Sequence, residues 1–173
     1  KGISVILIDF ESDPNALEKL KFTGKDSLLI GITMMTAQIN HGLGIARFIK
    51  EKVGNIPIVV GGVHPTLYPI ETVKSPHIDF TVQGEGEIAL FELISMIKGN
   101  KQEYPNIVGL SYKFNDKIFF NKEKNAFVDH FNYPDLDYAL LNKKRTSVSL
   151  VTSRGCPYDC AFCCNKAIIE RRT

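Results

Sequence analysis

The chemistry-bearing residues of this chain are concentrated near its end, where all four cysteines lie between Cys156 and Cys164. Cys156, Cys160 and Cys163 have the spacing C-x3-C-x2-C. Three thiolates on one tight loop can bind three irons of a cubane cluster and leave the fourth iron open to a chelating ligand. A disulfide framework would instead spread its cysteines along the chain. The spacing therefore predicts a [4Fe–4S] cluster in a reducing compartment, such as the cytoplasm.

The alternative for the same residues is a structural zinc knuckle with Cys164 as the fourth ligand. Zinc usually takes four ligands, commonly as two separated pairs. Adjacent cysteines complete a tetrahedron only with strain. We therefore favour the iron–sulfur cluster and interpret Cys164 as a bystander thiol.

Two glycine-rich stretches follow predicted strands, namely Gly61-Gly62-Val63-His64-Pro65-Thr66 and Gly84-Glu85-Gly86-Glu87. Open α/β sheets bind ligands at the carboxyl ends of parallel strands, and glycines let the backbone approach a large flat ligand closely. Neither stretch is a dinucleotide fingerprint, because no G-x-G-x-x-G opens a helix. Taken singly, each is better explained as a tight turn.

The elements that would position these loops alternate between strand and helix. Apolar runs predict strands at Ile3–Asp9, Leu28–Thr33, Ile56–Val60 and Asp79–Gln83. Apolar residues at steps of three and four predict helices at Ala37–Val53 and Glu87–Lys98, the latter with Leu90, Ile94 and Ile97 facing inward. A shorter helix is expected at Pro14–Phe22, after Asp13 as N-cap. This order predicts an α/β fold with a parallel sheet.

The pattern changes in the second half of the chain. Ile107–Phe114 and Lys117–Asn121 alternate around Asn115-Asp116 and predict a β-hairpin. Ser147–Thr152 reads as a new strand that leads into the cysteines. We therefore predict a Rossmann-like domain over residues 1–100, a hairpin-bearing linker over 101–145 and the start of another domain over 146–173.

Composition excludes several classes of function. Hydrophobic residues make up 44% of the chain and charged residues 23%, a globular mixture. The formal net charge of +2 is too small to indicate nucleic acid or an acidic membrane as a partner. The apolar runs are too short to span a bilayer.

The string Thr152-Ser153-Arg154-Gly155-Cys156-Pro157-Tyr158-Asp159-Cys160-Ala161-Phe162-Cys163 resembles the radical S-adenosylmethionine (SAM) signature. That family places this loop after the first strand of its (β/α) barrel, as predicted here. The resemblance implies that the open iron binds SAM, that one electron cleaves it to a 5′-deoxyadenosyl radical, and that Phe162 lies beside the adenine.

The glycine-rich stretches, with Asp79-Phe80 before the second, resemble the N-terminal domain of cobalamin-binding radical SAM enzymes, which shows G-G-x-H-P-T and then D-F-x-x-x-G-E-G-E. The loop Gly31–Thr36 takes the place of that family's other cofactor-facing loop. The resemblance implies cobalamin contacts at Thr33, Met34, Met35, Gly61, Gly62, His64, Pro65, Thr66, Gly84, Glu85, Gly86 and Glu87. We expect a bulky residue at Gly62 or Gly84 to fill space meant for the ligand.

The chain also departs from the family pattern. The family's domain opens with one more strand and helix before a segment such as Ile3–Asp9, and the barrel continues beyond Thr173. The cobalt-ligating motif D-x-H-x-x-G has only a near match at His41, where Ile39 replaces the Asp. We therefore interpret His41 as a surface or helix-packing residue and expect no histidine on cobalt.

The resemblance implies that the full enzyme is a radical SAM protein that methylates an unactivated carbon or performs an oxidative rearrangement. A one-electron reductant such as flavodoxin or ferredoxin would be its partner. This stretch alone is expected to be inactive, because most of the barrel is missing. The alternative is a non-catalytic module that binds cobalamin or another cofactor.

Overall fold

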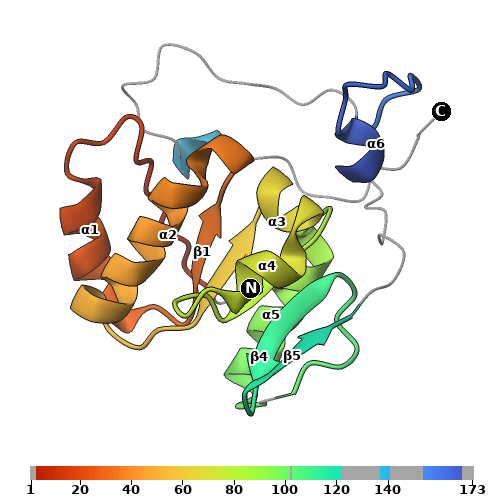
Figure 1. Ribbon diagram of the computed structural model, residues 1–173. Helices are drawn as coiled ribbons and strands as arrows, with labels where there is room; N and C mark the ends of the chain where they lie inside the picture. The colour runs from red at the N-terminus through yellow and green to blue at the C-terminus, as the bar shows by residue number, and fades with distance from the viewer. Residues whose placement is uncertain (1–2, 102, 122–136, 141–153, 169–173) are drawn as a thin grey trace.

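The computed structural model describes residues 3–101, 103–121, 137–140 and 154–168. Its strands form one sheet in the order β1-β2-β3-β4-β5 (Figure 1). They span Ile30–Thr33 (β1), Ile58–Gly61 (β2), Phe80–Val82 (β3), Leu110–Phe114 (β4) and Lys117–Phe120 (β5). β1, β2 and β3 are parallel, whereas β4 is antiparallel to both of its neighbours. The predicted Rossmann-like α/β fold is confirmed, and the predicted hairpin extends the same sheet, which is therefore mixed.

Six α-helices accompany the strands in the described part of the chain. They are α1 (Ala16–Thr23), α2 (Ile39–Phe48), α3 (Val63–Leu67), α4 (Pro69–Lys74), α5 (Glu87–Lys98) and α6 (Asn165–Ile168). α2 connects β1 to β2, and α3 and α4 connect β2 to β3. α2 follows a 3-10 turn at Thr36–Gln38 and continues into the π-helical turn η3 (Ile49–Val53). The helix predicted at Glu87–Lys98 has the predicted bounds. α3 and α4 were not predicted, and Pro14 lies before α1 instead of inside it.

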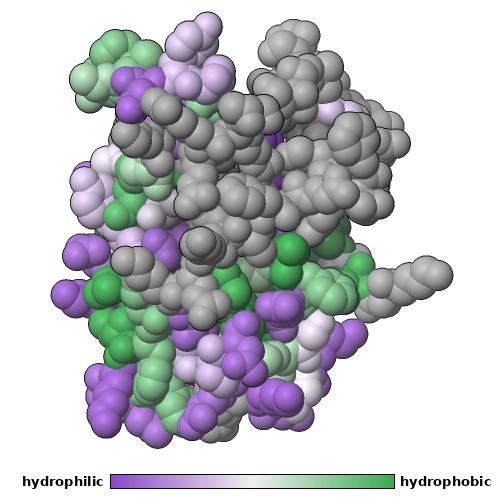
Figure 2. Space-filling model, turned by 90° about the vertical axis from the view of Figure 1, so that its right-hand side faces the viewer, coloured by the Kyte–Doolittle hydropathy of each residue, from purple (hydrophilic) through white to green (hydrophobic). Residues whose placement is uncertain are grey.

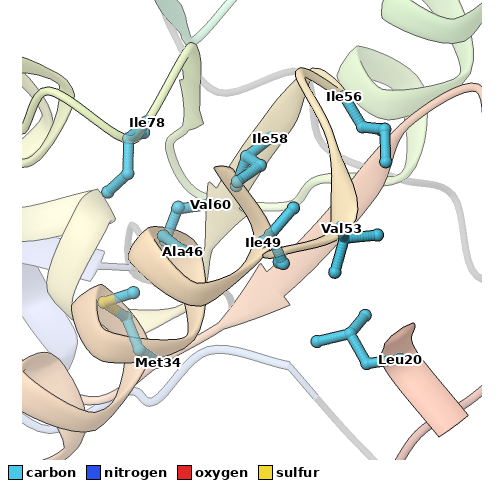
Figure 3. Packing of buried hydrophobic residues seen from close by; sticks show 9 residues of the cluster. All are labelled: Leu20, Met34, Ala46, Ile49, Val53, Ile56, Ile58, Val60 and Ile78. Carbon is cyan, nitrogen blue, oxygen red and sulfur yellow. The ribbon is translucent and has the colours of Figure 1, made fainter. Parts of the chain in front are cut away.

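The core lies on both faces of the sheet because β2 is covered on both sides. Ile58 and Val60 point toward α1 and α2 and pack with Leu20, Ala46 and Ile49 (Figure 3). Val59, between them, points to the other face and packs with Leu93 of α5. Alternate burial of this kind is what a central parallel strand requires. Because β2 is fixed on both faces, the loop that follows it starts from a rigid position.

The prediction of a buried strand at Ile3–Asp9 is wrong. The segment is irregular in the structure, and Val5, Ile6 and Leu7 are each more than half exposed. An apolar run becomes a strand only when a neighbouring backbone pairs with it. In the described residues β1 pairs with β2 alone, and the end of the segment turns at Asp9, which accepts a hydrogen bond from the Glu11 amide at 3.0 Å.

The surface beside the hairpin mixes polar and apolar side chains. Figure 2 shows green apolar and purple polar residues interspersed over the lower part of that face. Phe119 of β5 contributes a partly exposed ring that stacks on Tyr112 with 5.1 Å between the ring centroids. Among the helices of the described ranges, none has the length and apolar character needed to traverse a bilayer.

Candidate functional site

The three predicted cofactor-facing loops meet at one edge of the sheet. β1 ends at Thr33, β2 at Gly61 and β3 at Val82, and these strands are parallel neighbours. Their carboxyl ends therefore lie side by side, which is where open α/β sheets bind ligands. The backbone joins the first two loops directly, because the Met34 amide donates to the Gly61 carbonyl at 3.0 Å and the His64 amide donates to the Met34 carbonyl at 3.2 Å.

Thr66 ties the second loop to the third. Its hydroxyl donates to the Gly62 carbonyl at 2.7 Å and accepts from the Gly84 amide at 3.0 Å. The Gln83 side-chain amide donates to the Thr66 carbonyl at 3.1 Å. Gly84 has a φ of 66°, a left-handed conformation that favours glycine. The two glycine-rich stretches thus form one hydrogen-bonded unit.

The two glycines at the end of β2 have different roles. Among the described residues, a Cβ placed on Gly61 would meet no atom within 4 Å, so the space beside it is open in this part of the chain. A Cβ on Gly62 would lie 2.8 Å from the Met34 carbonyl oxygen and 2.9 Å from Thr33 Oγ1, and Gly62 has a φ of 102°. The expectation that a side chain at Gly62 would fill ligand space needs correction, because the neighbouring loop already occupies that space. Of the two glycines, Gly61 is the one with open space beside it in the described part of the chain.

The predicted methionines and histidines occupy different environments. Met34 is 1% exposed and its side chain lies in the core beside α2, so only its backbone is available at the edge (Figure 3). Met35 is 58% exposed. His64 is buried, with Nδ1 3.3 Å from Thr36 Oγ1 and its ring 5.3 Å from that of Tyr68, centroid to centroid. His64 therefore packs between the loops, and its neighbour Pro65 is also buried.

His41 lies on α2, where its side chain is exposed and its ring meets the edge of Phe10 at a centroid distance of 5.8 Å. This placement agrees with its interpretation as a surface or helix-packing residue.

The cysteine loop lies outside the sheet and is held at both ends. α6, which follows the loop, contacts α3. Arg154, which precedes it, donates from Nη2 to Glu87 Oε1 at 2.6 Å and has Nη1 3.4 Å from Glu85 Oε1. The hydrogen bond to Glu87 raises the pKa of Arg154 above its ordinary value. Sequence reasoning gave Arg154 no role, because only the folded chain brings it to acidic residues so distant in sequence.

All four cysteines are free thiols, with Cys156 partly exposed and Cys160, Cys163 and Cys164 exposed. The Cys163 amide donates to the Cys160 carbonyl at 3.0 Å, so the loop turns between these two residues. Within the described ranges, no three His, Cys, Asp or Glu side chains gather closely enough to hold one metal ion. The donor types fit an iron–sulfur cluster, and their assignment as ligands stays a prediction. Phe162 is 93% exposed, and the predicted strand Ser147–Thr152 lies outside the described residues.

Comparison with known proteins identifies the domain family that this chain matches. Residues 1–94 match the family model of the B12 binding domain. An uncharacterized methyltransferase of Pyrococcus horikoshii is 33% identical over 154 residues, which cover 85% of this chain and 33% of that protein. An anaerobic magnesium-protoporphyrin IX monomethyl ester cyclase of Synechocystis is 29% identical, over 94% of this chain and 34% of that protein. The chain thus spans about a third of the length of these curated relatives.

A solved structure has the same fold. The radical SAM methyltransferase TsrM from Kitasatospora setae, with cobalamin and a [4Fe–4S] cluster bound, matches with a TM-score of 0.55 at 21% identity. The match covers 65% of this chain and 23% of that one. The family match extends across all three loops of the sheet edge. A curated relative, the cobalamin-dependent radical SAM methyltransferase TokK of Streptomyces tokunonensis, is 26% identical over 69% of this chain and 19% of that protein. This chain therefore belongs to the B12-binding domain family, and its relatives include a radical SAM methyltransferase.

Proposed function

We propose that this chain is the cobalamin-binding part of a radical SAM enzyme, with cobalamin held against the carboxyl edge of β1, β2 and β3. The observation that carries the proposal is the open position at Gly61. It lies on an edge whose loops are joined by Thr66, next to a segment that bears three suitably spaced thiols. A rigid edge with one open backbone position suits a large flat ligand, because the loops need not reorganise to admit it.

The edge fits cobalamin in shape and chemistry. Gly61 offers its backbone, Thr33 and Met35 are exposed beside it, and Thr66 holds the next loop in place. When bound, cobalamin supplies a cobalt centre that carries a methyl group or assists a radical step. We propose no histidine ligand to cobalt, since His64 is packed against Thr36 and Tyr68.

The cysteine loop is proposed to hold a [4Fe–4S] cluster through Cys156, Cys160 and Cys163. When bound, such a cluster would supply the single electron needed to cleave SAM to methionine and a 5′-deoxyadenosyl radical. The exposed ring of Phe162 is available to stack on the adenine. The electron would come from a reductant such as flavodoxin or ferredoxin, and free thiols fit a reducing compartment such as the cytoplasm.

The reaction is proposed to be methylation of an unactivated carbon or an oxidative rearrangement. The two curated relatives described above are named as an uncharacterized methyltransferase and a cyclase, which supports keeping both reactions in the proposal. The alternative is a module that binds cobalamin without turnover. Iron content separates the alternatives, since only the enzyme needs the cluster.

Corrinoid binding is tested by substituting Gly61. Gly61→Leu should weaken binding of hydroxocobalamin by about tenfold or more, because the side chain enters the open space; a tenfold change corresponds to about 1.4 kcal/mol. Gly44→Leu is the matched control, since a Cβ on Gly44 also meets no atom of the described ranges within 4 Å but lies on the exposed side of α2. Absorbance titration measures both. Equal affinities of the two variants would contradict the proposed position of the ligand.

The cluster is tested by anaerobic reconstitution, with iron and sulfide measured beside the absorption spectrum. Cys156→Ser should abolish cluster formation, because each thiolate is needed to complete the ligand set. Cys164→Ser should leave iron uptake unchanged. Loss of iron in the Cys164 variant but not in the Cys156 variant would show that the ligands are wrongly assigned. Corrinoid binding without iron in the unsubstituted protein would favour the non-catalytic module.

A further inference from the structure

Arg154 links two loops with different proposed tasks. It immediately precedes Gly155 and Cys156, while its partners Glu85 and Glu87 belong to the loop that follows β3 and to the first turn of α5. One guanidinium group reaches both carboxylates through different nitrogens, at 2.6 Å to Glu87 and 3.4 Å to Glu85. Because the guanidinium group is planar and makes two contacts, it fixes the orientation of Arg154 relative to the two glutamates as well as its distance from them.

The contact is partly shielded from solvent. The side chains of Arg154, Glu85 and Glu87 are 29%, 9% and 32% exposed. The pair formed by Arg47 of α2 and Glu51 of η3 has a similar shortest distance of 2.8 Å, but its side chains are 66% and 44% exposed. Exposed pairs of that kind contribute little because water and salt screen them. Shielding makes the Arg154 contact the stronger constraint of the two.

The acidic side of the contact rests on rigid elements. Glu87 begins the 12-residue helix α5, where a carboxylate also interacts favourably with the helix dipole. Glu85 follows Gly84, whose amide is held by the Thr66 hydroxyl at 3.0 Å. A group anchored to these two residues is therefore anchored to the same unit that forms the proposed corrinoid edge.

The chain turns sharply just after the contact. Gly155 has a φ of 89°, which a residue with a side chain rarely adopts, so the backbone leaves Arg154 in a defined direction. At the far end of the loop, α6 contacts α3, and α3 itself follows Gly61 and Gly62. The cysteine loop thus has one anchor at each end, each attached to one of the two glycine-rich stretches.

We propose that Arg154 is a positioning residue, whose contact with Glu87 and Glu85 sets the orientation of the cysteine loop relative to the corrinoid edge before any cofactor binds. The reason for positioning the loop rests on the proposed function, but the contact itself can be tested in protein without cofactors. Between the two anchors the described loop residues are mostly exposed, so loss of one anchor frees the loop to swing about the other.

The test is a distance measurement between spin labels in the cofactor-free protein. One label is placed on Cys160, with the other three cysteines changed to Ser, and the second on Lys98→Cys, at the exposed end of α5. Double electron–electron resonance then reports the width of the distance distribution. Arg154→Gln should widen the distance distribution about twofold. Arg154→Lys should give an intermediate width, because lysine keeps the positive charge but lacks the planar guanidinium that reaches both carboxylates.

Two controls make the result specific. Arg47→Gln removes the same charge from the exposed pair and should leave the width unchanged. The double variant Arg154→Gln with Glu87→Gln should be no wider than Arg154→Gln alone, because both changes remove the same contact. A width for Arg154→Gln equal to that of Arg47→Gln, or a double variant clearly wider than Arg154→Gln alone, would overturn the proposal.

Thermal unfolding separates positioning from general stability. Arg154→Gln should widen the distribution while the melting temperature stays that of Arg47→Gln. Widening accompanied by a large fall in melting temperature would overturn the positioning role in favour of a structural one. Because no cofactor is present, this experiment can fail while corrinoid binding at Gly61 holds, and the reverse is equally possible.

Discussion

The adjacent glycines at the end of β2 give the sharpest test of the site geometry. We expect Gly62→Ala to destabilise the protein and Gly61→Ala to leave its stability nearly unchanged. At Gly62 the new Cβ would lie 2.8 Å from the backbone oxygen of Met34, which cannot move without shifting β1. The φ of 102° adds backbone strain of about 1–3 kcal/mol for a residue with a side chain.

The strain and the close contact together give an expected loss of about 3 kcal/mol. For a chain of this size, such a loss lowers the melting temperature by roughly 6–12 °C. At Gly61 no atom of the residues that the structure describes lies within 4 Å of the new Cβ, so the expected change stays within about 0.5 kcal/mol. Urea unfolding followed by circular dichroism measures the free energy of unfolding of both variants. Equal losses in the two variants, or a stable Gly62→Ala, would refute the described packing of the two loops.

Three further substitutions test other parts of the fold by the same unfolding assay. Thr66→Val should cost about 1–3 kcal/mol, because the Gly84 amide loses its acceptor; a neutral result would mean that the two loops are not joined there. Asp79→Asn should cost about 1–3 kcal/mol by weakening the 2.8 Å contact with Lys50, and stability that is independent of this change would exclude that contact. Leu93→Ala should cost about 2–5 kcal/mol, since Leu93 is fully buried, and a loss below about 1 kcal/mol would contradict its place in the core.

Local patterns predicted the elements that local forces determine. The helix at Glu87–Lys98 and the hairpin around Asn115-Asp116 appear as expected. In the hairpin, Asn115 and Asp116 both take positive φ values, of 50° and 59°, which these two residue types tolerate better than most. Their identity was therefore sufficient to locate the turn.

The inward face of α5 was predicted less well. Leu90 was expected to face inward but is 38% exposed, whereas Ala89 and Leu93 form the buried face. This helix carries apolar residues nearly all round, so steps of three and four fit more than one face. Which face is buried depends on the sheet it packs against, and that information is not local.

Features that depend on contacts between distant segments could not be predicted from local sequence patterns. α3 was missed because Val63–Leu67 is too short for a periodic pattern and contains Pro65, which a first helical turn nevertheless tolerates. The exposed segment Ile3–Asp9 shows the converse error, since an apolar run indicates affinity for a core without providing a strand to pair with. The contact between Arg154 and Glu87 joins residues 67 positions apart and has no local signal.

The spacing between Asp79 and Gly84 has a physical reason in the structure. Asp79 accepts the Ile58 amide at 2.7 Å at the amino end of β2, while the Gly84 amide donates to Thr66 Oγ1 at the carboxyl end of the sheet. Between these two attachments lies β3, only three residues long. A strand that is held at both ends can have only one length. Inserting or deleting one residue would turn the side chains beyond that point to the opposite face of the sheet. The fixed spacing of the D-F-x-x-x-G pattern therefore reflects the fixed length of β3, which is held at both ends. Only the glycine end of the pattern faces the proposed ligand.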